Sequence, residues 1–118
     1  NLLMLNKEIM LCMIIYGIGN FVVWFQLNGQ FKWDFWKDNL ILIGALGFPI
    51  SVAFYYATRL SYLGFDGLLW PGRLLAFGIS MLSFTLCTWL FLGESLTLKT
   101  VISIILSIVI VLIQLVGK

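Results

Sequence analysis

Apolar residues occupy four long stretches of this sequence, and polar residues gather in the gaps between them. The stretches cover about residues 9–27, 40–63, 68–92 and 100–116. A helix needs about 20 apolar residues to cross the hydrocarbon core of a bilayer, where its backbone must satisfy its own hydrogen bonds. None of the stretches alternates with the period of a membrane β-strand. The pattern therefore predicts an all-α membrane protein, with one four-helix transmembrane domain over residues 1–118.

Composition agrees with this prediction and narrows the possible chemistry. Hydrophobic residues make up 62% of the chain and charged residues 10%, whereas soluble domains carry about a quarter charged residues. A net charge of +2 is too small to indicate a nucleic-acid partner. The first stretch is too long for a signal peptide, and no small-residue cleavage site follows it.

Signatures of enzymes and of metal or cofactor sites are not found in the sequence. Histidine is absent, so no nucleophile has a histidine partner. Cys12 and Cys87 lie inside predicted helices without metal-ligand spacing, and we expect them to pack as small apolar residues. We therefore predict no catalytic residues, no metal and no cofactor.

Several residues mark where the predicted helices bend, start or stop. Pro49 removes a backbone donor and should bend the second helix. Pro71 suits the first turn of the third helix, Gly93 can close that helix, and Thr97 is a plausible cap for the fourth. The connector 30–39 alternates aromatic and charged side chains, which is typical of an anchor in the headgroup layer; a gate or a partner-docking loop is the alternative.

Polar side chains at membrane depth are the first candidates for function, because they are costly there. Tyr16, Asn20 and Trp24 recur every four residues on one face of the first helix. Asn20 either bonds to another helix or contacts a substrate. Trp70 and Arg73 share a face of the third helix. Arg73 either snorkels to the headgroups or points into the bundle and binds an anion, with Trp70 as a neighbouring wall.

The last helix carries a stripe of small and polar residues. Ser103 and Ser107 lie four residues apart, and Gln114 roughly extends the stripe. Such small residues allow close helix–helix approach in membranes. The stripe predicts a helix or dimer contact, and incidental small residues are the alternative.

The charges weakly indicate an orientation. Four crossings place Lys7, Arg59, Arg73 and Lys118 on one side of the membrane, and Lys32, Lys37 and Lys99 on the other. The positive-inside rule then favours cytoplasmic termini, which we expect to lie at a bacterial inner membrane.

The second half of the chain, 53–115, contains the segment ATRLSY at 57–62, Trp70, and the run WLFLGESLTLKTVISIILSIVIVLIQL at 89–115 with its Gly93-Glu94 pair. In these features it resembles the drug/metabolite transporter superfamily. The resemblance implies a four-helix bundle similar to the small multidrug resistance proteins, which act as dimers through their last helices. Ser103 and Ser107 lie in the corresponding helix of this chain. Those proteins carry a glutamate in helix one, where this chain offers Tyr16 and Asn20, so proton-coupled export of cations is not expected. Other four-helix members move lipid-linked sugars.

These observations lead to two functional hypotheses. The first is a small transporter or lipid-flippase-like protein, dimeric and surrounded by membrane lipids, for an anionic or phosphate-bearing substrate. Its site would lie between helices one to three, lined by Tyr16, Asn20, Trp24, Trp70 and Arg73. The second is a non-transporting accessory subunit of a larger membrane protein complex.

Overall fold

The structure is a computed structural model that describes residues 6–116. Within that range four helical stretches are long and apolar enough to cross a membrane, at Lys7–Phe31, Leu40–Gly64, Trp70–Leu92 and Leu98–Leu115. The prediction of an all-α membrane protein with four transmembrane helices is therefore confirmed. The helices are α1 (Lys7–Asn28), α2 (Asp34–Asp38), α3 (Leu40–Ala45), α4 (Gly47–Gly64), α5 (Trp70–Cys87) and α6 (Leu98–Leu115), with a 3-10 turn η1 (Gly29–Phe31) and a π-helical turn η2 (Thr88–Leu92).

The helix ends follow local sequence signals. The Asn6 side chain accepts a hydrogen bond from the Ile9 N–H at 2.9 Å and caps α1. Thr97 caps α6 in the same way, as predicted, by accepting from the Thr100 N–H at 3.2 Å. Pro71 lies in the first turn of α5, and Gly93 ends η2 with a φ of 69°, a backbone conformation that glycine adopts without strain.

The second transmembrane stretch is interrupted where its proline predicts a bend. The chain leaves α3 after Ala45 and enters α4 at Gly47, with Leu46 between them. Pro49 has no N–H to donate to the Ala45 carbonyl four residues earlier, so the helical ladder is broken at this point. The two segments nevertheless form one stretch of spanning length.

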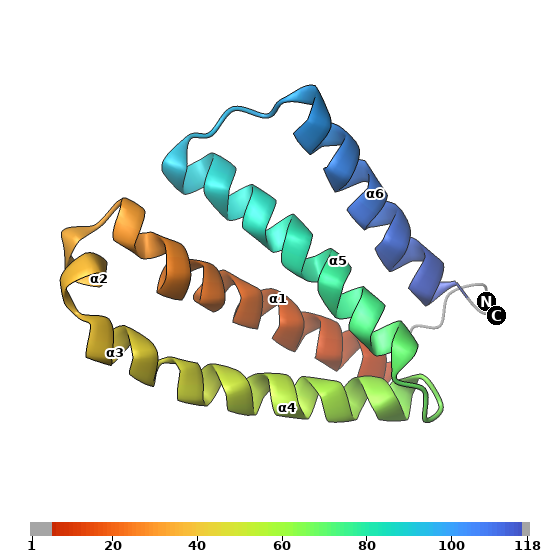
Figure 1. The fold of residues 1–118 in the computed structure, drawn as a ribbon. Helices are drawn as coiled ribbons and strands as arrows, with labels where there is room; N and C mark the ends of the chain where they lie inside the picture. Colours follow the sequence, from red (N-terminus) through yellow and green to blue (C-terminus); the bar gives the residue numbers. More distant parts are fainter. Residues whose placement is uncertain (1–5, 117–118) are drawn as a thin grey trace.

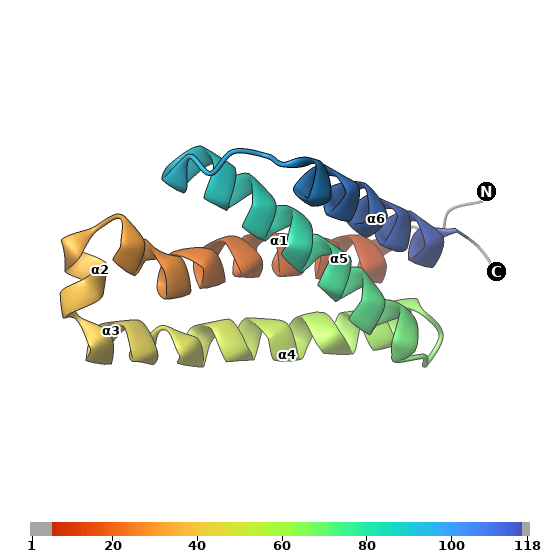
Figure 2. The same ribbon diagram turned by 45° about the horizontal axis from the view of Figure 1, so that its top comes forward.

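The four transmembrane helices lie side by side in the order α4, α1, α5, α6 (Figures 1 and 2). The extensive contacts are those of α1 with α4, of α1 with α5, and of α5 with α6. The described molecule is accordingly flat, with extents of 48 × 36 × 18 Å. α1 therefore lies between α4 and α5, while α6 packs on α5 at one edge of the bundle.

Small residues allow neighbouring helices of the bundle to approach one another closely. The Asn6 side chain donates to the Gly64 carbonyl at 3.0 Å and joins the start of α1 to the end of α4. Gly72 of α5 packs directly on Ser61 of α4. Gly78 of α5 faces α6, where a Cβ would lie 3.1 Å from the Ser107 carbonyl oxygen. Such contacts matter in a membrane because van der Waals packing, rather than exclusion from water, drives helix association.

The predicted stripe on the last helix divides between two environments. Ser107 is 4% exposed and lies at the contact with α5, whereas Ser103 is exposed and Gln114 is half-buried. Both serine hydroxyls donate to the carbonyl one turn earlier at 2.9 Å. Ser107 therefore serves helix packing within the chain, and Ser103 remains available on the surface of α6.

Charged residues lie near the two ends of the helices. Lys7, Arg59 and Arg73 lie toward the end where α1 begins, and Lys32, Lys37 and Lys99 lie toward the opposite end. Lys118, also used in the orientation argument, lies outside the described residues.

Candidate functional site

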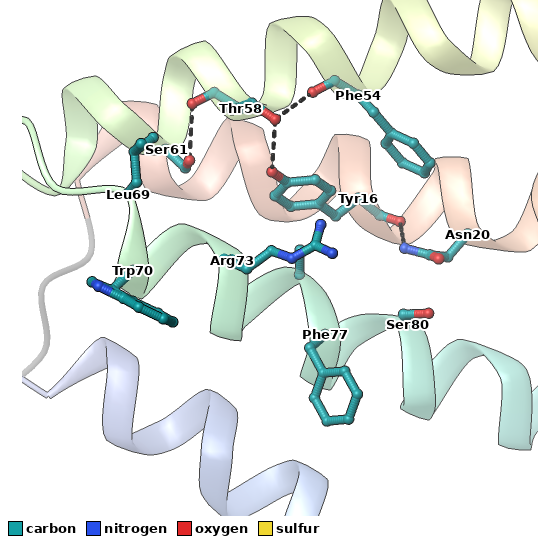
Figure 3. Close-up of a pocket in the computed structure, with 11 residues that line it drawn as sticks. Tyr16, Asn20, Phe54, Thr58, Ser61, Leu69, Trp70, Arg73, Phe77 and Ser80 are labelled. Atoms are coloured by element: carbon teal, nitrogen blue, oxygen red, sulfur yellow. Dashed lines mark hydrogen bonds between the residues drawn. The ribbon is translucent and has the colours of Figure 1, made fainter.

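A cavity of about 700 Å³ lies between α1, α4 and α5 (Figure 3). We call it the main cavity. Polar, aromatic and aliphatic side chains line it together with a single arginine: Tyr16, Asn20, Phe54, Thr58, Ser61, Leu69, Trp70, Arg73, Ala76, Phe77 and Ser80. Its volume is in the range of small-molecule binding sites, which are about 300–1,000 Å³.

Helical periodicity explains how each helix supplies its part of this wall. Residues 54, 58 and 61 of α4 follow the i, i+4, i+7 spacing of one helix face. On α5 the spacing of three and four residues continues through 70, 73, 77 and 80. α1 adds Tyr16 and Asn20, one turn apart.

Hydrogen bonds hold the polar side of the main cavity in place. The Thr58 hydroxyl donates its only proton to the Phe54 carbonyl at 2.8 Å. In the contact between the Tyr16 and Thr58 hydroxyls, 3.3 Å long, Tyr16 is therefore the donor. Asn20 donates to the Tyr16 carbonyl at 2.7 Å, and Ser61 donates to the Thr58 carbonyl at 2.9 Å. These bonds fix the side chains before any ligand arrives.

Arg73 is the charged residue of this wall. Its side chain extends from α5 toward Tyr16 of α1 (Figure 3). Among residues 6–116, no side chain forms a hydrogen bond or ion pair with its guanidinium, whereas the neighbouring Arg59 donates to the Tyr55 hydroxyl at 2.9 Å. Arg73 therefore offers its five N–H donors to a ligand in the main cavity.

No carboxylate of the described residues lines the main cavity. The structure describes all five acidic residues of the chain, and each lies in a connector or in the first turn of α1. Asp66, the acidic residue closest to Arg73 in sequence, lies in the turn after α4 with a φ of 56°. The electrostatics of the main cavity therefore favour an anion.

The structure brings together four of the five predicted site residues, Tyr16, Asn20, Trp70 and Arg73. The fifth, Trp24, does not line the main cavity. It lies eight residues beyond Tyr16, about 12 Å farther along α1, and is 2% exposed. Its Nε1 donates to the Thr88 hydroxyl at 3.0 Å, and its ring packs against Phe25 and Phe91. Trp24 therefore joins α1 to η2 as a structural contact.

None of the five residues predicted from the sequence lies on the α4 side of the wall, although a signal was present. Thr58 and Ser61 are separated by three residues and Phe54 precedes Thr58 by four, which places all three on one face. Likewise, the helix face that carries Trp70 and Arg73 continues, at a spacing of four and then three residues, to Phe77 and Ser80. The remaining wall residues, Leu69 and Ala76, carry no polar signal.

Comparison of the chain with protein-family models, with curated proteins and with solved structures gave no match.

Proposed function

We propose that this chain is a small transporter or lipid-flippase-like protein of the drug/metabolite transporter type, whose main cavity binds an anionic or phosphate-bearing amphiphile. The observation that carries this proposal is Arg73, a cation without a partner among the described residues, in a wall whose other side chains are polar, aromatic and aliphatic. Arginine suits phosphate because its planar donors match two phosphate oxygens at once.

The depth of the wall residues supports an amphiphilic substrate. Arg73 lies three residues into α5, about 4.5 Å from the helix end at about 1.5 Å per residue. Asn20 lies 13 residues into α1, which corresponds to about 20 Å from the start of that helix. The main cavity thus extends from the level of lipid headgroups toward the middle of the membrane. A phosphate at Arg73 would leave the rest of the molecule beside Phe54, Phe77 and the polar groups of Tyr16 and Asn20.

A dimer in a bacterial inner membrane with cytoplasmic termini completes this proposal. The exposed Ser103 lies on an α6 surface that α5 does not cover, and small residues there favour close approach of a second helix. Sedimentation in mild detergent tests the dimer, with an expected protein mass of twice 13.4 kDa.

Binding of matched amphiphiles tests the substrate class. Dodecyl phosphate and dodecyltrimethylammonium are titrated into the protein in nanodiscs, and tryptophan fluorescence is followed. Loss of a charge-assisted hydrogen bond costs about 1.5–3 kcal/mol, so Arg73→Gln should weaken dodecyl phosphate about 10- to 150-fold. Lys37→Gln, at the opposite end, is the matched control and should leave affinity unchanged. Equal affinities of wild type and Arg73→Gln for dodecyl phosphate, or preference of the wild type for the cation, would refute the proposal.

An accessory subunit is the second candidate, and one observation favours it. The connector between α1 and α3 presents Phe31 and Phe35 at its surface, with 68% and 57% of each side chain exposed. Aromatic side chains are common at the centres of protein interfaces. Stable co-purification with unrelated membrane proteins, lost on Phe35→Ser, would support this role over the transporter.

A further inference from the structure

A second groove lies against the main cavity on the outer side of α4. This outer groove has a volume of about 460 Å³ and is lined by Phe54, Tyr55, Thr58, Arg59, Tyr62 and Leu69. Phe54, Thr58 and Leu69 also line the main cavity. The two spaces therefore share a wall and lie next to each other.

Adjacent faces of α4 serve the two spaces. Residues 54, 58 and 61 face the main cavity, and residues 55, 59 and 62, each one position later, face the outer groove. Since successive residues turn by about 100° around a helix, the second face points farther away from α1. Tyr55 and Tyr62 are well exposed on this face, which in a transmembrane helix places them against lipid.

Arg59 is held in a fixed position in the outer groove. Its guanidinium donates to the Tyr55 hydroxyl at 2.9 Å. It also lies 5.2 Å from the centroid of the Tyr55 ring and 5.4 Å from that of Tyr56, within the range of cation–π attraction. In the described part of the chain its polar and cation–π partners are these two tyrosines, and no carboxylate forms an ion pair with it. The charge is therefore available to an anion.

Arg59 and Arg73 lie at similar depths near the same end of the bundle. Arg59 is five residues before the end of α4, about 7.5 Å along the helix, and Arg73 is about 4.5 Å into α5. Five residues, 65–69, connect these two helix ends. The interfacial layer on each side of a bilayer is about 5–7 Å thick. The Cα atoms of both arginines thus lie close to the interfacial layer at the same end of the bundle.

We infer that the outer groove is the lateral path by which an anionic lipid of the surrounding bilayer reaches the main cavity, with Arg59 as its first contact and Arg73 as its second. This inference rests on the proposed function and specifies its substrate as a membrane lipid. Both arginines belong to the same end of the bundle, so a phosphate that passes from one to the other does not have to cross the hydrocarbon core. The tail stays beside Phe54 and Leu69, which form the apolar part of the shared wall, and beside the rings of Tyr55 and Tyr62 in the outer groove.

The test separates a lipid that arrives through the bilayer from an anion that arrives through water. Hexadecyl phosphate, delivered in phosphatidylcholine vesicles, is mixed with protein in nanodiscs of the same lipid, and binding is followed by stopped-flow tryptophan fluorescence. Butyl phosphate, added from solution, is titrated in parallel. Arg59→Gln should slow association of hexadecyl phosphate roughly three- to tenfold, because it removes the charge that attracts the headgroup, and should leave the Kd of butyl phosphate unchanged. Lys37→Gln should alter neither.

A second variant keeps the test informative if Arg59→Gln folds poorly. Tyr62→Trp enlarges a side chain in the outer groove without changing charge, and it should slow the same long-chain association. Unchanged association of hexadecyl phosphate in both variants would overturn the lateral path. If Arg59→Gln weakened the binding of both phosphates equally, the lateral path would also be overturned, and Arg59 would be assigned to the main cavity. If instead Arg73→Gln binds both phosphates as tightly as wild type, the proposed function itself fails.

Discussion

The contact between α5 and α6 depends on the absence of a side chain at Gly78, and Gly78→Ala measures this dependence. A Cβ at this position would clash with the Val111 side chain and lie 3.1 Å from the Ser107 carbonyl oxygen. Val111 is β-branched and has few alternative rotamers in a helix, and the Ser107 carbonyl cannot move without its helix. We therefore expect α6 to be displaced. Overpacking of this kind costs about 1–3 kcal/mol.

Gly17→Ala is the matched control for this change. Gly17 lies within α1, and apart from its chain neighbours and the backbone of its own helix no atom would come within 4 Å of its Cβ. Any effect of replacing glycine by alanine within a helix, about 0.5–1 kcal/mol, is common to both variants and cancels in the comparison. The difference between the two therefore reports the packing cost alone.

Reversible unfolding in mixed micelles with increasing SDS provides the measurement. Gly78→Ala should be less stable than Gly17→Ala by about 1–3 kcal/mol. Adding Val111→Ala should recover part of that loss in a double-mutant cycle, because it removes one of the two clashing groups. If Gly78→Ala is as stable as Gly17→Ala, α6 does not pack on α5 as described.

Three further predictions concern contacts inside the bundle. Trp24→Phe should lower stability by at least about 1 kcal/mol, because the hydrogen bond to Thr88 is lost and the smaller phenyl ring leaves part of the buried indole space unfilled. The exposed Trp89→Phe should have no effect in the same SDS titration. Tyr16→Phe should lower the free energy of unfolding by less than about 1 kcal/mol, because the Thr58 hydroxyl still donates to the Phe54 carbonyl. A larger loss of stability than for Trp24→Phe would contradict the assignment of Tyr16 as the donor to Thr58. Cys12 and Cys87 are fully buried, so N-ethylmaleimide should label them only after unfolding in SDS, while a cysteine introduced by Ser95→Cys should react in the native protein. Mass spectrometry counts the adducts. Rapid labelling of Cys12 or Cys87 in the native protein would contradict their burial.

Sequence alone determined the features that depend on one helix at a time. Length and hydrophobicity specified the four transmembrane stretches, and Thr97, Pro71 and Gly93 marked helix ends through local backbone chemistry. Pairs within one helix, such as Trp70 with Arg73, also followed from sequence, because the rotation per residue is constant. These properties need no knowledge of the neighbouring helix.

Only the tertiary structure decided which helix faces meet. Trp24 shares a face with Tyr16 and Asn20, yet it meets Thr88 of η2 at a level beyond the main cavity. Thr58 lines the main cavity because of the rotation of α4 about its axis, which turns the face with residues 54, 58 and 61 toward α1. In a membrane lipid tails are as apolar as leucine, so hydrophobic pattern does not specify helix rotation. The rotation is set by close packing at small residues such as Gly72 and Gly78, whose partners lie on other helices.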